Sequence, residues 1–87
     1  MERRNRLNII YDILKVIKAK GEIKKTHIMY QANLAHNQMK GYLNELYEKG
    51  FIENTGGKRP LIGITKKGAD FFQKYAQVRE FEKTFGL

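Results

Sequence analysis

The sequence predicts an α+β domain that is mostly helical and contains one short β-hairpin. Apolar residues recur at helical spacing through most of the chain. Between residues 51 and 64 this period breaks into two short extended runs around a turn rich in glycine. The 87 residues are enough for one domain with a small core.

The first predicted helix covers residues 6–19. Asn5 is suited to cap its N-terminus, and Gly21 is suited to end it. Its apolar positions follow steps of three and four residues: Leu7, Ile10, Leu14 and Ile17, with Ile9, Ile13 and Val16 beside them. This spacing predicts one wide apolar face that turns toward the core.

Two shorter helices follow a short extended link at residues 22–24. The second helix is predicted from His27 to about Ala32, with Thr26 as its N-cap. Asn33 can take the left-handed conformation that turns the chain. The third helix is predicted from about residue 35 to residue 49, where Gly50 ends it. Its apolar stripe consists of Met39, Tyr42, Leu43, Leu46 and Tyr47.

The chain after Gly50 predicts a hairpin and a last helix. Residues 51–54 and 61–64 read as short strands, and residues 55–60 read as their turn. Thr65 is the expected cap of a helix over residues 66–85. This order of elements is that of a helix-turn-helix followed by a wing. We therefore expect residues 1–65 to form a winged helix-turn-helix and residues 66–87 to form a C-terminal helix that packs and dimerises.

The composition argues against an enzyme, a metal protein or a membrane protein. Cysteine, serine and tryptophan are absent, and the only histidines, His27 and His36, are nine positions apart. This spacing does not match a zinc site, and no phosphate-binding loop or cofactor motif occurs. No apolar run approaches the roughly 20 residues that cross a bilayer, and no apolar signal segment follows the N-terminus. The expected location is cytoplasmic and associated with the nucleoid.

The positive charge is concentrated in two segments. The chain carries 17 Lys and Arg against 9 Asp and Glu, a net charge of +8. Residues 1–41 carry nine basic and three acidic groups, and residues 55–67 carry four basic groups and no acidic one. Residues 42–54 have an acidic excess of two, and residues 68–87 are balanced. The excess therefore falls largely on the elements of a winged helix that face phosphates.

Three motifs carry a resemblance to a known family. Leu43-x-x-Leu46-x-x-x-Gly50-Phe51-Ile52 resembles the end of a winged-helix recognition helix running into the wing. Ile64-Thr65-x-x-Gly68 resembles the exit from the second wing strand. The segment from Lys25 to Leu34 is similar to the second helix of small archaeal winged-helix proteins.

The chain thus resembles the archaeal 10a-type DNA-binding proteins and related small archaeal winged helix-turn-helix regulators over nearly its whole length. This resemblance implies binding of double-stranded DNA and a homodimer. Two features depart from it. Ala35 stands where many relatives have the Ser that caps the recognition helix, and the last helix is shorter than in members with a long dimerising coiled coil.

The candidate DNA-binding residues surround the predicted helix-turn-helix and the wing. They are Lys24, Lys25, Thr26, His27, Tyr30, His36, Asn37, Gln38, Lys40, Gly41, Asn44, Lys58 and Arg59. Asn and Gln can pair with adenine, whereas Lys and Arg can bind phosphates or guanine. Gly41 costs about 1 kcal/mol of helix stability against Ala, and on an exposed face it would let a backbone come close to the duplex. The alternative is that these residues form an ordinary polar helix face that contacts only solvent.

The two ends of the chain carry further candidates. Arg3, Arg4 and Arg6 form a basic arm that either touches the DNA backbone or is disordered. In the last helix, Phe71, Tyr75, Val78, Phe81 and Phe85 are the candidate dimerisation residues. The alternative is that this helix folds back wholly onto its own core. An antiparallel dimer would read two half-sites about 10–10.5 bp apart.

These observations predict a homodimeric DNA-binding protein, most simply a transcriptional regulator. Two alternatives remain open. One is an architectural DNA-binding protein of chromatin, and the other is a winged-helix module whose basic face meets RNA or an acidic protein. No cofactor, metal or membrane partner is expected.

Overall fold

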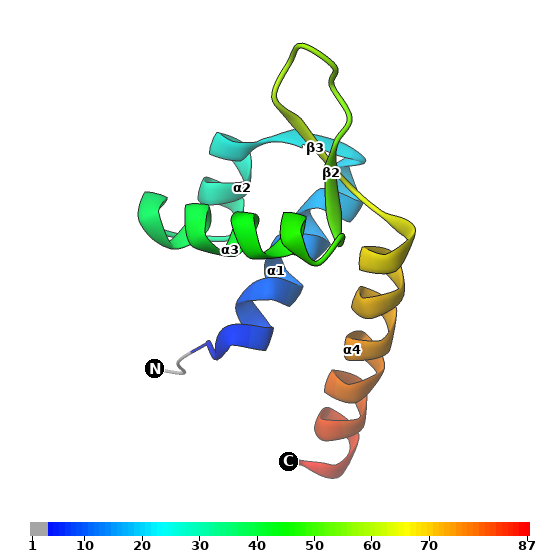
Figure 1. Cartoon of the computed structure of the whole chain (residues 1–87). Coiled ribbons are helices and arrows are strands. Elements are labelled where there is room, and N and C mark those ends of the chain that lie inside the picture. Colours follow the sequence, from blue (N-terminus) through cyan, green and yellow to red (C-terminus); the bar gives the residue numbers. More distant parts are fainter. Residues whose placement is uncertain (1–3) are drawn as a thin grey trace.

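The computed structural model describes residues 4–87 as a winged helix followed by a C-terminal helix (Figure 1). Its elements in chain order are α1 (Arg6–Lys20), β1 (Glu22–Lys24), α2 (Lys25–Gln31), α3 (His36–Glu48), β2 (Ile52–Asn54), β3 (Leu61–Ile64) and α4 (Lys66–Phe85). The predicted fold class is confirmed, and the bounds of α1, α3 and α4 differ from the predicted ones by at most one residue.

The core lies between α1, α2, α3 and the sheet. Its largest fully buried side chains are Ile13, Leu14, Ile17, Ile28, Leu46 and Ile62. Burying six large aliphatic side chains stabilises the fold by about 1.5–3 kcal/mol each before entropy is subtracted. The prediction that Leu7 belongs to this core is wrong, because 41% of it is exposed. Leu7 lies in the first turn of α1, which extends past the other core elements (Figure 1).

The sheet has three antiparallel strands in the order β1-β3-β2. β2 and β3 form the predicted hairpin, or wing, and Ile52 pairs with Ile64 in it. β1 pairs with the other edge of β3 and places Ile23 opposite Ile62. The sequence predicted β1 as a short extended segment but not as a third strand of the sheet, because three residues are too few to show the alternation that reveals a paired face.

The helix ends follow local hydrogen bonds where the sequence offers them. The backbone N–H of Asn8 donates to Asn5 Oδ1 at 2.8 Å, and that of Gly68 donates to Thr65 Oγ1 at 3.0 Å. Both predicted caps are confirmed. Thr26, however, does not cap α2. The chain passes directly from β1 into α2, so Lys24 occupies the N-cap position and Thr26 lies inside the first turn.

The turn between α2 and α3 depends on Asn33. This residue has a φ of 55°, in the left-handed region that was predicted for it. Ala35 then occupies the N-cap position of α3 and, having no side-chain acceptor, makes no capping hydrogen bond. α3 is therefore held mainly by its buried stripe of Met39, Leu43 and Leu46.

α4 packs its aromatic side chains on the rest of the chain mainly through its first half, and in its second half Arg79 lies over the Tyr11 ring of α1 at 4.5 Å. Tyr11 of α1 stacks on Phe72 with ring centroids 4.7 Å apart. Gly68 lies so close to β2 that a Cβ there would meet the Phe51 carbonyl oxygen at 2.1 Å. Further along, α4 runs past the core (Figure 1). Among residues 4–87, no helix is both long enough and apolar enough to span a membrane.

Candidate nucleic-acid interface

The first group of predicted contact residues lies where β1 leads into α2. Lys24, Lys25, Thr26 and His27 are consecutive and all exposed. Tyr30 follows one turn later, with 75% of its surface exposed. Because α2 has only seven residues, the positive potential here comes from the lysine side chains.

α3 presents two different flanks beside its buried stripe. The predicted contact residues on this helix are all exposed: His36, Asn37, Gln38, Lys40, Gly41 and Asn44. Those at positions 36, 40 and 44 line a groove shared with α2, whereas those at positions 37, 38 and 41 line a hollow on the other flank. The sequence predicted one continuous face, and the structure divides it into this groove and this hollow.

The groove between α2 and α3 brings basic groups from two helices together. Its volume is about 260 Å³, and Lys25 of α2 lines it together with Lys40 of α3. Tyr47 also lines the groove but is not among the predicted contact residues. Burial raises the pKa of the Tyr47 phenol above its ordinary value, so the hydroxyl stays protonated and can donate. The sequence placed Tyr47 in the apolar stripe, although the polar tip of a tyrosine often reaches solvent at an interface.

The hollow on the other flank of α3 is lined in part by Gly41, which has no side chain. Its volume is about 310 Å³, and Asn37, Gln38 and Gly41 contribute to its lining. Arg6 reaches across from α1 to form an ion pair with Glu45 at the same hollow. This pairing offsets the negative charge of Glu45, which would otherwise repel a phosphate.

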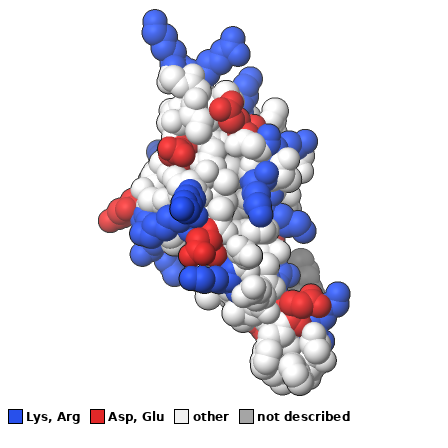
Figure 2. Space-filling view, turned by 90° about the vertical axis from the view of Figure 1, so that its right-hand side faces the viewer, with Lys and Arg blue, Asp and Glu red and all other residues white. Residues whose placement is uncertain are grey.

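The wing carries an exposed basic tip between β2 and β3. Its loop is closed by the Arg59 N–H, which donates to the Gly56 carbonyl oxygen at 3.0 Å. Lys58 and Arg59 are both exposed. Figure 2 shows Lys and Arg side chains projecting from the end of the molecule where the wing lies, whereas the end of α4 is white. The other basic residues of segment 55–67, Lys66 and Lys67, begin α4 instead.

The N-terminal arginines pair within the chain. Arg4 donates to the carbonyl oxygens of Ala32 at 2.6 Å and Asn33 at 2.9 Å, and it pairs with Asp12 at 3.0 Å. A helix C-terminus leaves its last carbonyls without helical partners. By donating to these carbonyls at the end of α2, Arg4 stabilises the α2–α3 turn. With Arg6 bound to Glu45, both arginines are held by partners in their own chain, so the alternative of a disordered arm does not describe them. Their contact with the DNA backbone stays a prediction. Arg3 lies outside the described residues.

The two histidines lie on different helices, nine positions apart. His27 and His36 lie on the exposed surfaces of α2 and α3. Within residues 4–87, no three His, Asp or Glu side chains are placed to hold a metal ion together.

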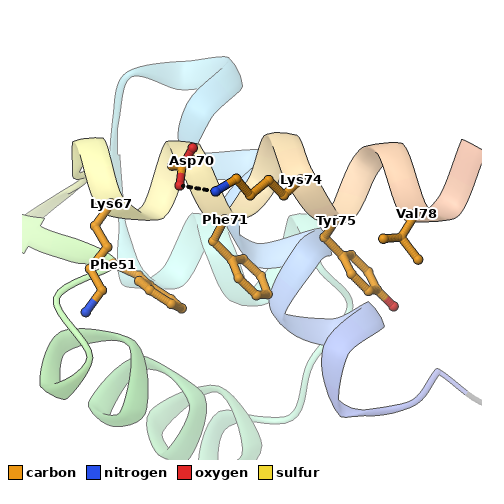
Figure 3. A pocket seen from close by; sticks show the side chains of 7 residues that line it. All are labelled: Phe51, Lys67, Asp70, Phe71, Lys74, Tyr75 and Val78. Carbon is orange, nitrogen blue, oxygen red and sulfur yellow. Dashed lines mark ion pairs between the residues drawn. The ribbon is translucent and has the colours of Figure 1, made fainter.

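The predicted dimerisation residues fall into two sets along α4. Phe71 stacks on Phe51 at 5.0 Å, and Tyr75 donates to Asn8 Oδ1 at 2.9 Å, so both contact their own chain. They also line, with Val78, a largely apolar groove of about 370 Å³ on one side of α4 (Figure 3).

The second set continues along α4 beyond this groove. Val78, Phe81 and Phe85 are 49%, 56% and 65% exposed. The prediction that the second half of α4 does not fold back onto its own core is therefore consistent with the structure. The rings of Phe81 and Phe85 contact each other at 4.8 Å between centroids, which leaves an apolar surface at the end of the helix.

Comparisons with known proteins agree with this architecture. A family model described as winged helix-turn-helix matches residues 3–83. Two uncharacterized proteins of Methanocaldococcus jannaschii are each 38% identical to the chain. MJ0290 is matched over 76 residues, which are 87% of this chain and 34% of that protein. MJ0287 is matched over 65 residues, which are 75% of this chain and 66% of that protein.

The chain thus spans about a third of the first relative and about two thirds of the second. A solved structure, that of Sso10a-2, a DNA-binding protein from Sulfolobus solfataricus, superposes with a TM-score of 0.72. It covers 95% of this chain and 90% of its own, with 23% sequence identity. At that identity the likeness is one of fold.

Proposed function

Because the chain belongs to the winged helix-turn-helix family, we propose that it binds double-stranded DNA through α2, α3 and the tip of the wing. The groove in which Lys25 and Lys40 face the same space beside His36 is the observation that carries this proposal. Like charges repel, so a fold gains nothing by gathering them unless an anion neutralises them. The likeness in fold to Sso10a-2, a DNA-binding protein, supports the proposal.

The two kinds of side chain on this surface have different tasks. Lys25, Lys40, Lys58 and Arg59 bind phosphates, and the wing tip extends these contacts beyond the helices. α3 enters the major groove, where the amides of Asn37, Gln38 and Asn44 read base edges. Side chains of this base-reading type would be superfluous in a protein that only coats DNA. We therefore propose transcriptional regulation as the role.

The working unit in this proposal is a homodimer formed through α4, with residues 66–87 as the packing and dimerisation helix. Its support is the apolar seam of Phe71, Val78, Phe81 and Phe85, which recur at steps of seven, three and four. A helix of 20 residues is about 30 Å long. The exposed second half of such a helix presents apolar surface that a second copy can cover.

Two α4 helices that run antiparallel, with the two Val78 residues facing each other, cover the apolar residues of this seam best. This arrangement places Phe71 opposite the partner's Phe85, so the partner's ring enters the groove beside Phe51. It also places Lys74 opposite the partner's Glu82, which is a favourable pair. A parallel pair in register would instead place Lys74 opposite the partner's Lys74 and Glu82 opposite the partner's Glu82.

The salt dependence of duplex binding tests the proposed function. If four basic side chains in each subunit neutralise one phosphate each, log affinity should fall with log salt with a slope of about −7 for the dimer. The measurement is a series of gel shifts or anisotropy titrations from low to physiological salt. Double-stranded RNA and an acidic polypeptide serve as competitors. A failure of every duplex to bind at low salt, or stronger competition by RNA, would overturn the proposal.

A further inference from the structure

Gly41 is the one glycine of this chain that neither backbone conformation nor packing accounts for. All eight glycines lie among the described residues. Four of them have a positive φ, namely Gly21, Gly50, Gly57 and Gly86. At Gly56, Gly63 and Gly68, an added Cβ would come within 2.1–2.7 Å of a neighbouring atom. Each of these seven is therefore required by the chain's own fold.

Gly41 has neither a positive φ nor a close neighbour that would exclude a side chain. It lies inside α3, where glycine is unfavourable because it loses the most backbone freedom. A Cβ at this position would meet no atom of the described residues within 4 Å, the adjoining helix backbone aside. An alanine would thus fit without any rearrangement and would strengthen the helix. Nothing in the described residues therefore accounts for a glycine at this position.

The surroundings of Gly41 indicate what approaches it. Asn37 precedes it by one helical turn and lines the same hollow. Asn44 follows it by three residues at the edge of the groove, so the exposed ridge of α3 between groove and hollow carries an asparagine on each side of Gly41. Asn side chains are short and reach a base edge only when the helix axis lies close to the floor of the major groove. The one acid that lines the hollow beside Gly41, Glu45, is paired with Arg6. Short side chains beside Gly41, with the one acid of the hollow neutralised, suit a close approach to DNA.

We infer that Gly41 sets the depth at which α3 enters the major groove, and that it is therefore a position that determines sequence specificity. This inference rests on the proposed DNA binding. A side chain at position 41 holds the helix away from the bases, so that Asn37 and Asn44 lose their contacts. The lysines and the wing, which have longer reach, keep their contacts with phosphates.

The test compares the wild-type protein with Gly41→Ala and Gly41→Gln. A duplex is first selected with the wild type from a random library, and affinities are then measured for this duplex and for an unrelated one. Thermal unfolding of each variant is followed in parallel. Gln73→Ala, at an exposed position of α4, is the matched control for a helix-stabilising change elsewhere.

We expect Gly41→Ala to raise the melting temperature by about 4–8 °C. Both substitutions at position 41 should lower the affinity for the selected duplex by roughly ten- to hundredfold, with the larger loss for Gln, while the affinity for the unrelated duplex changes little. An unchanged preference in both variants would overturn the inference, as would a lower melting temperature for Gly41→Ala. If the wild type binds no duplex, the proposed function itself fails.

Discussion

Replacing Phe81 and Phe85 with Glu is expected to convert the dimer into a monomer and to lower the affinity for a duplex with two half-sites by about a hundredfold or more. Both rings are largely exposed in the single chain, so their loss should leave the core intact. Four carboxylates would then be buried against aromatic side chains at the proposed seam without partners, which opposes association. A monomer binds each half-site separately and loses the gain in effective concentration. Sedimentation gives the mass, and titration gives the affinity.

The control for this prediction adds the same charge to another side of α4. Gln73→Glu with Thr84→Glu changes two exposed residues that lie away from the seam, and it should leave the mass unchanged. Since the chain has no cysteine, Val78→Cys provides a single thiol that an antiparallel pair would join across the axis. A wild type that sediments as a monomer would contradict the dimer. A dimer in which Val78→Cys does not cross-link would contradict only the antiparallel register.

Replacing Lys58 and Arg59 with Ala is expected to weaken binding to all duplexes about equally, by about tenfold or more at physiological salt. Each residue is exposed at the tip of the wing, where phosphate contact carries no sequence information. If both neutralise a phosphate in each subunit, the salt slope of the dimer should decrease in magnitude by about 3.6. Titrations on a selected and an unrelated duplex at several salt concentrations measure both effects.

A second pair of basic residues tests whether binding depends on the position of the charges or only on the total charge. Lys15→Ala with Lys83→Ala removes a similar charge from the groove between α1 and α4, away from the proposed interface. This variant should keep most of the wild-type affinity. Equal losses from the two pairs would mean that binding follows net charge alone. A wing variant that binds as well as the wild type would place the interface elsewhere.

Much of the fold could be predicted from the sequence because its long elements carry strong periodic signals. The stripe of α3 and the caps Asn5 and Thr65 are local features, and each lies where it was predicted. The short extended segment at residues 22–24 was predicted, but its place in the sheet was missed, because that depends on pairing with β3, some 40 residues later in the chain. Thr26 was misplaced as a cap because no local signal shows that β1 passes into α2 without a loop.

In the candidate site, too, the features set by neighbouring residues could be predicted, whereas those set by residues far away in the chain could not. Residue type identified the basic and amide side chains, and the helical period placed them on the outer side of α3. The separation into a groove and a hollow could not be predicted, because it depends on what α1 and α2 place beside α3. The partners of Arg4 were equally hidden, since Ala32 and Asn33 accept through their backbone carbonyls whatever their side chains are.

The most direct test of the central claim is to map the DNA contact surface by chemical shift perturbation. Labelled protein is titrated with a selected duplex, and the amide signals that shift or broaden are assigned. We expect them to cluster in residues 24–30, in the exposed positions of α3 and in residues 55–60, with signals of Val78 to Phe85 little changed. Perturbations confined to α4, or none at a duplex concentration well above that of the protein, would contradict the account.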